Sequence, residues 1–447
     1  MSEVLEKVPK ETTPSAPTLK QAFWYWLKLG FISFGGPAGQ IAIMHKDLVE
    51  DKRWISEKRF LHALNYCMVL PGPEAQQLAT YIGWLMHKTR GGLLAGGLFV
   101  LPSLLILMAL SYIYMRFGST PVVAGVLYGI KPAVVAIVLF AAYRIGSRAL
   151  KNKALWAIAV ASFLAITLLK LPFPLIVGLA ALFGYLGNRF VPTLFASGGG
   201  HKAADKNFGK AVIDDDTPTP AHAHFSWCGL VKFLLIGLAI WLVGMAALMA
   251  MFGWTAVYTQ MAWFFTKAAL LTFGGAYAVL PYVYQGAVTH YAWLTSTQMM
   301  DGLALGETTP GPLIMVVAFV GFVGGWSHAA VYNPMLSAML AACLVTFFTF
   351  LPSFIFIFMG APFIESTKNN LKFNAPLTAI TAAVVGVIVA LALFFALQVF
   401  WPNHTHIDWL AMLAAALGFV ALYRLKANTI RLIGVFAIFG LLHAWLI

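Results

Sequence analysis

Apolar residues form long, almost uncharged stretches along this chain, and short polar segments separate them. Most stretches approach the roughly 20 residues that an α-helix needs to cross the hydrocarbon core of a bilayer. We mark 13 such segments, at residues 21–44, 60–86, 92–115, 125–143, 154–170, 172–190, 226–250, 259–283, 299–325, 336–358, 375–395, 409–423 and 432–447. The pattern therefore predicts an all-α polytopic membrane protein.

Four of these segments carry a helix breaker near the middle. The breakers are Ser33-Phe34-Gly35-Gly36, Pro71-Gly72-Pro73, Thr272-Phe273-Gly274-Gly275 and Pro310-Gly311-Pro312. The second pair repeats the first at a constant offset of 239 residues without a gap, and a further 11 residues of offset bring Leu101-Pro102-Ser103 onto Leu351-Pro352-Ser353. The chain is therefore predicted to be an internal duplication.

Positive charge predicts the orientation of the two copies, because cytoplasmic loops carry an excess of Lys and Arg. Loops 45–59, 87–91 and 144–153 are basic, whereas their counterparts at 284–298, 326–335 and 394–408 contain neither Lys nor Arg. The second copy is therefore expected to be inverted in the membrane. The odd segment at 226–250 would perform the inversion.

The same rule places the N-terminal tail, loop 45–59 and loop 87–91 on one side of the membrane. Segments 21–44 and 60–86 then enter, turn at their breakers and leave on the side of entry. We expect them to be re-entrant helical hairpins, mirrored by 259–283 and 299–325. The alternative is a pair of kinked spanning helices in each copy, with loop 45–59 outside despite its charge.

Composition excludes several other classes. With 60% hydrophobic and 10% charged residues, the chain is too apolar for a soluble globular protein. The net charge of +13 arises from short loops, not from an exposed basic face with interleaved aromatic residues, so nucleic acid is not an expected partner. Cys67, Cys228 and Cys343 lack the spacing of a metal or disulfide site. With no catalytic motif visible, we expect no enzyme activity, no metal and no cofactor.

The breakers suggest anion binding. A helix that ends inside a membrane leaves backbone groups unpaired, so such breaks lie in the protein interior or line a wet cavity, and the N-terminal end of a half-helix attracts anions. One helix end contributes only about 0.3 to 2 kcal/mol, so a doubly charged anion requires several ends and fixed cations. We predict a binding site made by Lys28, Ser33, Phe34, Gly35, Gly36, Pro71, Gly72, Pro73, Lys267, Thr272, Phe273, Gly274, Gly275, Thr308, Thr309, Pro310, Gly311 and Pro312. Lys131 is a further candidate cation; for Lys28 and Lys131 the alternative is snorkelling toward an interface.

Three acids lie in apolar segments: Glu74, Asp301 and Glu307. Intramembrane carboxylates are functional candidates by default. A carboxylate beside an anion site suits proton coupling, because it can take up a proton when the anion binds. A helix-capping role for Glu74, or a salt bridge to one of the lysines, stays open as an alternative.

At these residues the sequence resembles the chromate ion transporter family, in its long two-domain bacterial form. The resemblance rests on FISFGGPAGQIAIMH from Phe31, KRWISEKRFLHALNY from Lys52, LPGPEAQQLATYIGW from Leu70, LTFGGAYAVLPYV from Leu271 and DGLALGETTPGPLIMVV from Asp301. It covers nearly all of residues 21–395. It implies an inner-membrane transporter that exports chromate, driven by the proton motive force, and confers chromate resistance.

We therefore expect a multi-pass secondary transporter of two inverted repeats in the bacterial inner membrane, with a cytoplasmic N-terminus. Its expected partners are the lipid bilayer and chromate or a sulfate-like oxyanion, and a homodimer is compatible with the sequence. The alternatives are a transporter of sulfate or another oxyanion, and an anion channel on the same scaffold. The predicted parts are a disordered cytoplasmic tail (1–20), an N-terminal transporter repeat (21–194), a polar cytoplasmic linker (195–225), a linking transmembrane helix (226–258) and a C-terminal inverted repeat (259–447).

Overall fold

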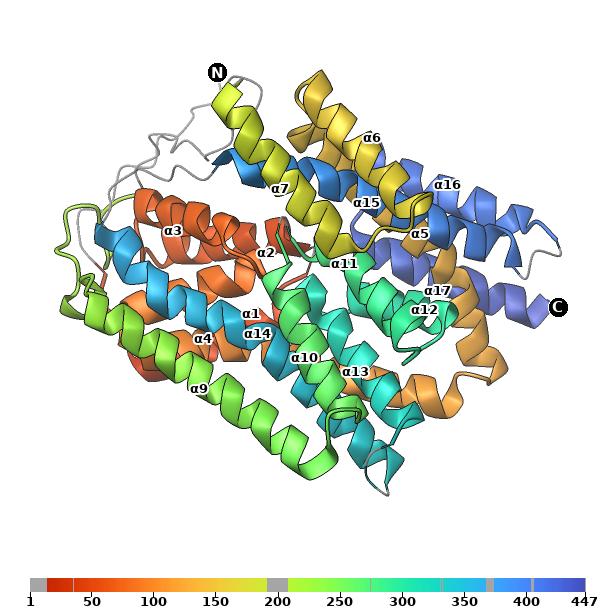
Figure 1. Ribbon diagram of the computed structural model, residues 1–447, viewed down its shortest axis with the longest axis horizontal. Coiled ribbons are helices and arrows are strands. Elements are labelled where there is room, and N and C mark those ends of the chain that lie inside the picture. Colours follow the sequence, from red (N-terminus) through yellow and green to blue (C-terminus); the bar gives the residue numbers. More distant parts are fainter. Residues whose placement is uncertain are drawn as a thin grey trace, which may run out of the picture.

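The chain folds into α-helices packed side by side, as a computed structural model shows (Figure 1). The structure describes residues 14–34, 36–190, 208–273, 275–329, 331, 333–366, 374–402 and 406–446. Within these ranges there are 16 α-helices, and the only β-type contact is an isolated bridge between Ile55 and Ile213. Gly35, Gly274, most of the predicted tail and linker residues 195–207 lie outside the described residues.

The helices fall into two groups around the linker. The first group comprises α1 (Leu19–Ile32), α2 (Gly36–His45), α3 (Glu57–Val69), α4 (Glu74–Phe117), α5 (Pro121–Ala149), α6 (Lys153–Thr167) and α7 (Phe173–Phe190). The second comprises α9 (Trp227–Phe252), α10 (Val257–Leu270), α11 (Ala276–Tyr284), α12 (Ser296–Thr308), α13 (Val316–Ser327), α14 (Pro334–Ser366), α15 (Asn374–Phe400), α16 (Trp409–Tyr423) and α17 (Thr429–Leu446). Each of the 13 predicted segments coincides with helix, and the four segments with a breaker are each divided by it.

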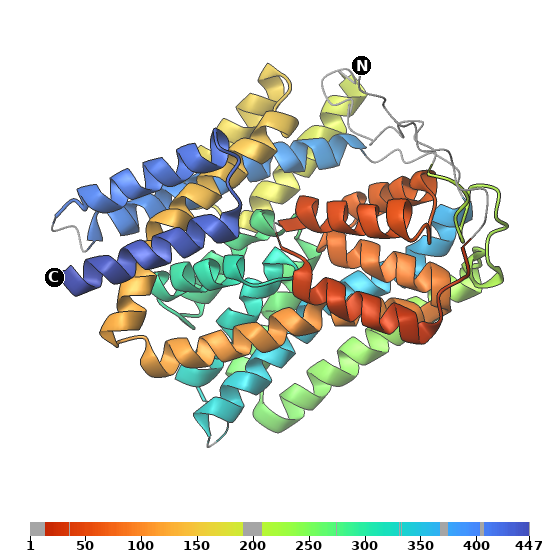
Figure 2. The ribbon, with the colours of Figure 1, turned by 180° about the vertical axis from the view of Figure 1, so that it is seen from behind.

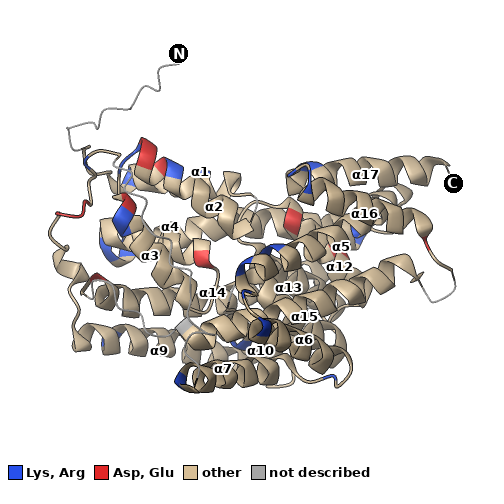
Figure 3. Ribbon diagram, turned by 90° about the horizontal axis from the view of Figure 1, so that it is seen from above, with Lys and Arg blue, Asp and Glu red and all other residues tan. Residues whose placement is uncertain are grey.

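Seven helices are long and apolar enough to cross a membrane, which confirms the predicted class. They are α4, α5, α7, α9, α14, α15 and α17. Helix α9 lies at the outer edge of the bundle and buries only 11% of its most apolar window (Figure 1). Charged residues are few along the helices, which are mostly tan in Figure 3. An apolar surface of this kind is expected where lipid replaces water.

Helix α4 is bent back on itself. Its backbone leaves helical geometry at His87 and Lys88 (φ −133° and 56°). The leg before this turn packs antiparallel on the leg after it, with Gly83 against Ala95 and Thr80 against Gly96. The first leg, Glu74 to Met86, therefore returns toward the side from which α3 starts.

The breakers turn the chain back instead of kinking it. Arg59, near the start of α3, and Tyr81, in the first leg of α4, both bind the carboxylate of Glu365 on α14, at 3.1 and 2.5 Å. The rings of Tyr66 and Tyr81 are 6.2 Å apart. In a straight kinked helix these residues would be separated by about 1.5 Å per residue, so α3 and the first leg of α4 form a hairpin.

The other three breaks have the same geometry. In α10 and α11, Phe264 stacks on Tyr282 with 4.8 Å between ring centroids, and Gly302 of α12 lies against the ring of Phe319 on α13. In the first hairpin Lys52, which follows the short π-helix Lys46–Asp51, lies over the Tyr25 ring of α1 at 5.7 Å. All four broken segments are helical hairpins within the protein.

The ends of the first two hairpins lie on one face. His87 pairs with the backbone carbonyl of Pro17 at 2.8 Å. The described part of the linker covers the same face, because Ser56 donates to Asp215 at 2.7 Å and Arg59 to the carbonyl of Thr217 at 2.7 Å. The N-terminal segment, loop 45–59 and the turn at 87 therefore share one side, as the charge pattern predicts.

Local structure repeats between the two halves at the offset of 239 residues. Trp54 donates to the carbonyl of Leu48 and Trp293 to that of Ala287, at 2.7 and 2.8 Å. A π-helix occupies Lys46–Asp51 and again Gln285–His290. These paired features support the predicted duplication, while the inversion of one copy in the membrane stays a prediction.

The final helices of each half pack on the other half. Gly184 of α7 packs on Ala375 and Ala379 of α15, and Gly440 of α17 packs on Gly125 and Gly129 of α5. Seen from behind, the blue helices α16 and α17 occupy one end of the molecule and the red helices α1 to α3 the other (Figure 2). The halves are therefore interlocked, and the broken hairpins meet between them.

Candidate functional site

The four breaks bind one another across the two halves. The amide of Gly72 donates to the carbonyl of Thr272 at 2.8 Å, and the amide of Gly311 donates to that of Ser33 at 2.8 Å. Each Pro-Gly-Pro turn thus pairs with the breaker of the opposite copy. Backbone groups released by the breaks are satisfied inside the protein, as burial requires.

The repeated Leu-Pro-Ser segments support these turns, again across the halves. Ser353 of α14 packs against Gly72, and Ser103 of α4 packs against Gly311. Both glycines have positive φ, 128° and 99°, a conformation that residues with a Cβ atom rarely adopt. Glycine is required twice at each turn, by the backbone angle and by the close serine.

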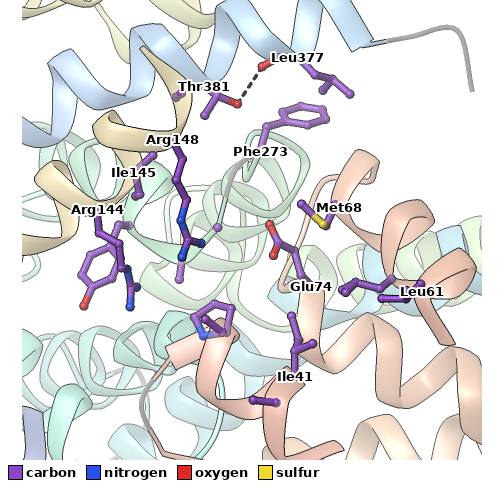
Figure 4. A pocket seen from close by; sticks show the side chains of 18 of the residues that line it. Ile41, Leu61, Met68, Glu74, Arg144, Ile145, Arg148, Phe273, Leu377 and Thr381 are labelled. Atoms are coloured by element: carbon purple, nitrogen blue, oxygen red, sulfur yellow. Dashed lines mark hydrogen bonds between the residues drawn. The ribbon is translucent and has the colours of Figure 1, made fainter. Parts of the chain in front are cut away.

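A cavity of about 1100 Å³ leads from one face of the molecule to the breaks. Helices α2 and α3 form one wall, and α5 and α15 form the other (Figure 4). Its mouth is lined by residues of loops 45–59 and 144–153: Glu50, Glu57, Lys151 and Asn152. Its inner end is lined by Phe273, Gly275, Ala276 and Tyr277.

Two arginines project into this cavity from the last turns of α5. Figure 4 shows Arg144 and Arg148 pointing inward, with Arg148 facing Glu74 across the space. Glu74 is the first residue of α4, directly after the Pro-Gly-Pro turn. A guanidinium group offers several donors in a rigid fork that matches an oxyanion. The cavity therefore combines two fixed cations with one carboxylate.

Two helices begin at the cavity. Helix α11 starts at Ala276 and α2 at Gly36, and Ala276, Pro37 and Ala38 line the space. The amides of a first helical turn have no partner within the helix, and the positive end of the helix favours an anion. These two helix starts supplement the arginines, so the cavity has the chemistry of an oxyanion site.

A second carboxylate lies close behind the cavity wall. Tyr277 donates to Glu307 of α12 at 2.6 Å, and Arg144 attracts the same carboxylate electrostatically. Glu307 thereby connects the end of α12 to the arginine cluster through a tyrosine that lines the cavity.

The predicted site residues are only partly brought together. Of the described candidates, Phe273, Gly275 and Glu74 line the cavity. The hydroxyls of Thr272, Thr308 and Thr309 donate to carbonyls of their own helices, those of Ala268, Leu305 and Gly306, and are not directed at a ligand. Ser33 Oγ is buried and has no partner among the described residues.

The structure places both predicted lysines elsewhere. Lys28 is exposed and lines a separate cavity of about 650 Å³ with Asp47, Asp51 and Lys52. Lys267 lies over the ring of Trp263 at 5.3 Å and does not line the anion cavity. Neither lysine can therefore supply the cation in this conformation.

Asp301 belongs to a different cluster. It is 2% exposed, accepts a hydrogen bond from Tyr114 at 3.0 Å and pairs with Lys131 at 3.6 Å. Its salt bridge to Lys131 corresponds to the alternative left open for the acids.

The sequence analysis missed Arg144 and Arg148 because their charge was attributed to a cytoplasmic loop. Helix α5 continues to Ala149, so both side chains project from a helix. Their spacing of four residues, which places them on one face of a helix, was the available signal. Metal chemistry has no support in the described part of the chain, which holds no cluster of three or more His, Cys, Asp or Glu side chains.

Comparison with known proteins gives consistent results. A chromate transport protein of Cupriavidus metallidurans is 30% identical over 402 residues, 87% of this chain and 87% of that protein. Another, of Pseudomonas aeruginosa, is 30% identical over 429 residues, 95% of this chain and 92% of that protein. A probable chromate transport protein of Synechococcus elongatus is 29% identical over 374 residues, 83% of each chain. No solved structure matches. The family described as chromate transporter matches residues 20–185 and 259–441, and the chain therefore belongs to the chromate transporter family.

Proposed function

We propose that this protein exports chromate, a divalent tetrahedral oxyanion, across the bacterial inner membrane, driven by the proton motive force, and so confers chromate resistance. The observation that carries the proposal is the cavity in which Arg144 and Arg148 face the starts of two helices. Membership of the family and the names of its relatives support the choice of anion.

The groups present are sufficient in strength for a dianion. A hydrogen bond to a charged group contributes about 1.5 to 3 kcal/mol, and a helix start adds about 0.3 to 2 kcal/mol. Two arginines and two helix starts together can offset the cost of removing a doubly charged ion from water. The oxyanion would bind between Arg144, Arg148 and the start of α11, with the breakers forming the floor.

Glu74 is the proposed proton carrier of the site. In the empty cavity its carboxylate faces Arg148 and partly balances the two cations. A bound oxyanion would replace that balance and repel the carboxylate, so Glu74 would take up a proton. Anion binding and proton uptake would then be linked. Glu307, held by Tyr277 next to Arg144, is the second candidate for this role.

The proposed orientation places the cavity mouth in the cytoplasm. The mouth is formed by the basic loops 45–59 and 144–153, which favour the cytoplasmic side. On this view the two copies are inverted repeats and the hairpins are re-entrant. Substrate sites between such repeats are common in secondary transporters.

The shape of the cavity favours a transporter over an anion channel. The cavity reaches the breakers, and beyond them the buried side chains of α12 and α13, such as Met300, Leu303 and Phe319, fill the interior. A channel needs a continuous path, whereas a transporter opens to one side at a time.

The test is transport by the purified protein in proteoliposomes. An imposed pH gradient should drive chromate uphill, and excess sulfate should compete weakly. Flux that only follows the chromate gradient would indicate a channel. Strong competition by sulfate, with faster sulfate flux, would assign the other oxyanion and overturn the choice of chromate.

A further inference from the structure

The two faces of the molecule differ at one pair of helices. The cavity opens between α3 and α15 (Figure 4). The counterpart of α3 in the second half is α12, at the offset of 239 residues. The counterpart of α15 in the first half is α5, at the offset of 250 residues shown by the Leu-Pro-Ser segments. Helices α5 and α12 pack against each other, so the pair that is open on one face is closed on the other.

The helix packing supports the second offset independently. Gly184 packs on Ala375 and Ala379, and Gly440 packs on the glycines at 125 and 129. These two contacts are the same contact in the two halves, because 375 and 379 correspond to 125 and 129. Thr381, which lines the cavity, therefore corresponds to Lys131.

The cavity walls have buried counterparts. Leu61 and Leu64 of α3 line the cavity. Their counterparts on α12 are Met300 and Leu303, which are 2% and 5% exposed. If α12 left α5, these two side chains and Lys131 would line a second cavity on the opposite face.

One ion pair distinguishes the closed face from the open one. Asp301 of α12 accepts from Tyr114 of α4 at 3.0 Å, and its counterpart His62 of α3 pairs with the carbonyl of Ile364 of α14 at 3.1 Å. Because Ile364 corresponds to Tyr114, this contact exists on both faces. The pair between Lys131 and Asp301, at 3.6 Å, has no equivalent across the open cavity, where His62 and Thr381 occupy the matching positions.

We propose that Lys131 and Asp301 fasten the gate on the closed face. When this gate opens, Lys131 becomes the cation that binds the oxyanion on its exit path. The inference rests on the proposed function, since it assumes transport of a divalent oxyanion by exchange of two open states. In the exchanged state α3 would close on α15, while α12 would separate from α5. Lys131, released from Asp301, would be the exit-side counterpart of the arginines.

The asymmetry of charge fits release on that side. The present cavity holds two arginines on α5. The corresponding last turns of α15, around residues 394–398, carry no charged residue. A single lysine on the exit path would hold a dianion less strongly than two arginines, so the anion would be released there.

The experiment measures which cavity is open, using thiol labelling in a background with Cys67, Cys228 and Cys343 replaced by alanine. Leu64→Cys reports the present cavity and Leu303→Cys reports its counterpart. Membrane-impermeant maleimide is applied to intact cells and to inverted vesicles. Asp301→Asn should raise the labelling rate at position 303 about three- to tenfold, and lower it at position 64, because a lost contact shifts the population toward the other state.

Lys131→Gln breaks the same pair from the other side and should shift both rates in the same directions, which keeps the test valid if one variant fails to fold. The matched control is Glu365→Gln, which removes a buried carboxylate of the α3–α14 contact and should not expose position 303. Unchanged rates in both pair variants, or equal increases at both positions, would overturn the gate.

The role of Lys131 has its own readout. In the Asp301→Asn background, chromate should protect position 303 from labelling, and adding Lys131→Gln should abolish the protection. Protection that persists without the lysine would overturn its role in the exit path. Labelling requires no net transport, so a gate that opens as described in a protein that moves no chromate would reject the proposed function alone.

Discussion

At the scale of single residues, Gly72 and Gly311 hold the centre of the molecule together. Each donates the bond that joins the two halves, at positive φ and against a serine of the Leu-Pro-Ser segments. Alanine at either position would strain the backbone by about 1 to 3 kcal/mol and would also overlap the serine. We therefore expect Gly72→Ala and Gly311→Ala each to lower the melting temperature of the purified protein in detergent.

Two other glycines provide the control for this prediction. Gly97 and Gly178 lie in helices, and an added Cβ would meet no atom within 4 Å. Alanine at these positions should leave the melting temperature unchanged or slightly higher. A loss of stability as large as at the turns would show that the turns are not special.

The arginines are expected to determine affinity for the anion. Arg148→Gln, and separately Arg144→Gln, remove a charge-assisted contact of about 1.5 to 3 kcal/mol, which corresponds to roughly 10- to 100-fold in affinity. Chromate uptake into inverted vesicles should show this loss as a higher KM. Arg189→Gln, at the exposed end of α7, is the matched control. Lys267→Ala should retain transport, and its failure would restore the site expected from the sequence.

The same residues show where sequence reasoning ends. The breakers were recognisable because Gly and Pro have fixed backbone consequences. The cations were misplaced because a basic residue near a helix end has the same sequence signal whether it faces a loop or a cavity. The choice between Lys28 and Arg148 depends on which side of a helix faces the other half, and that is decided by packing between residues hundreds of positions apart.

At the scale of elements, the hairpins determine which loops share a face. Asp51 and His290 are exposed and occupy corresponding positions after the first hairpin of each half. If the halves are inverted repeats, cysteines at these two positions will be labelled from opposite sides of the membrane. Asp51→Cys should react with an impermeant reagent only in inverted vesicles, and His290→Cys only in intact cells.

A cysteine at Lys88 gives the internal control. Lys88 lies at the turn that follows the second hairpin, so it should be labelled from the same side as position 51. Labelling of positions 51 and 88 from opposite sides would mean that the second segment crosses the membrane, which would contradict the re-entrant arrangement.

The elements were the most predictable level of the structure. Hydrophobic length marked every helix, and the repeated breakers marked every division, because both depend on local sequence. The turn within α4 at His87 and Lys88 follows from the charge of that loop. The hydrogen bonds between the turns of opposite halves could not be predicted, since they join residues about 200 to 280 positions apart whose pairing is set only by the assembled bundle.

At the scale of the whole molecule, the interlocked halves connect the anion site to both faces. Helix α5 carries Arg144 and Arg148 at one end and Lys131 in its middle, while its neighbours α16 and α17 belong to the other half. Movement of α5 relative to α12 therefore changes access on one face and the position of the arginines on the other. A transporter requires this connection, because the site must never be open to both faces at once.

The coupling of anion and proton movement is a property of the whole molecule, and Glu74 is the residue on which it can be tested. Its carboxylate faces the arginines inside the cavity, so the Glu74→Gln variant presents a permanently neutral side chain there. Chromate should still bind and exchange across proteoliposomes loaded with chromate, because the arginines and helix starts remain. An imposed pH gradient should no longer drive uphill movement, because no proton is taken up with the anion. Glu307→Gln, measured in parallel, separates the two carboxylates: if only this variant is uncoupled, the proton moves on Glu307 and the role assigned to Glu74 is wrong.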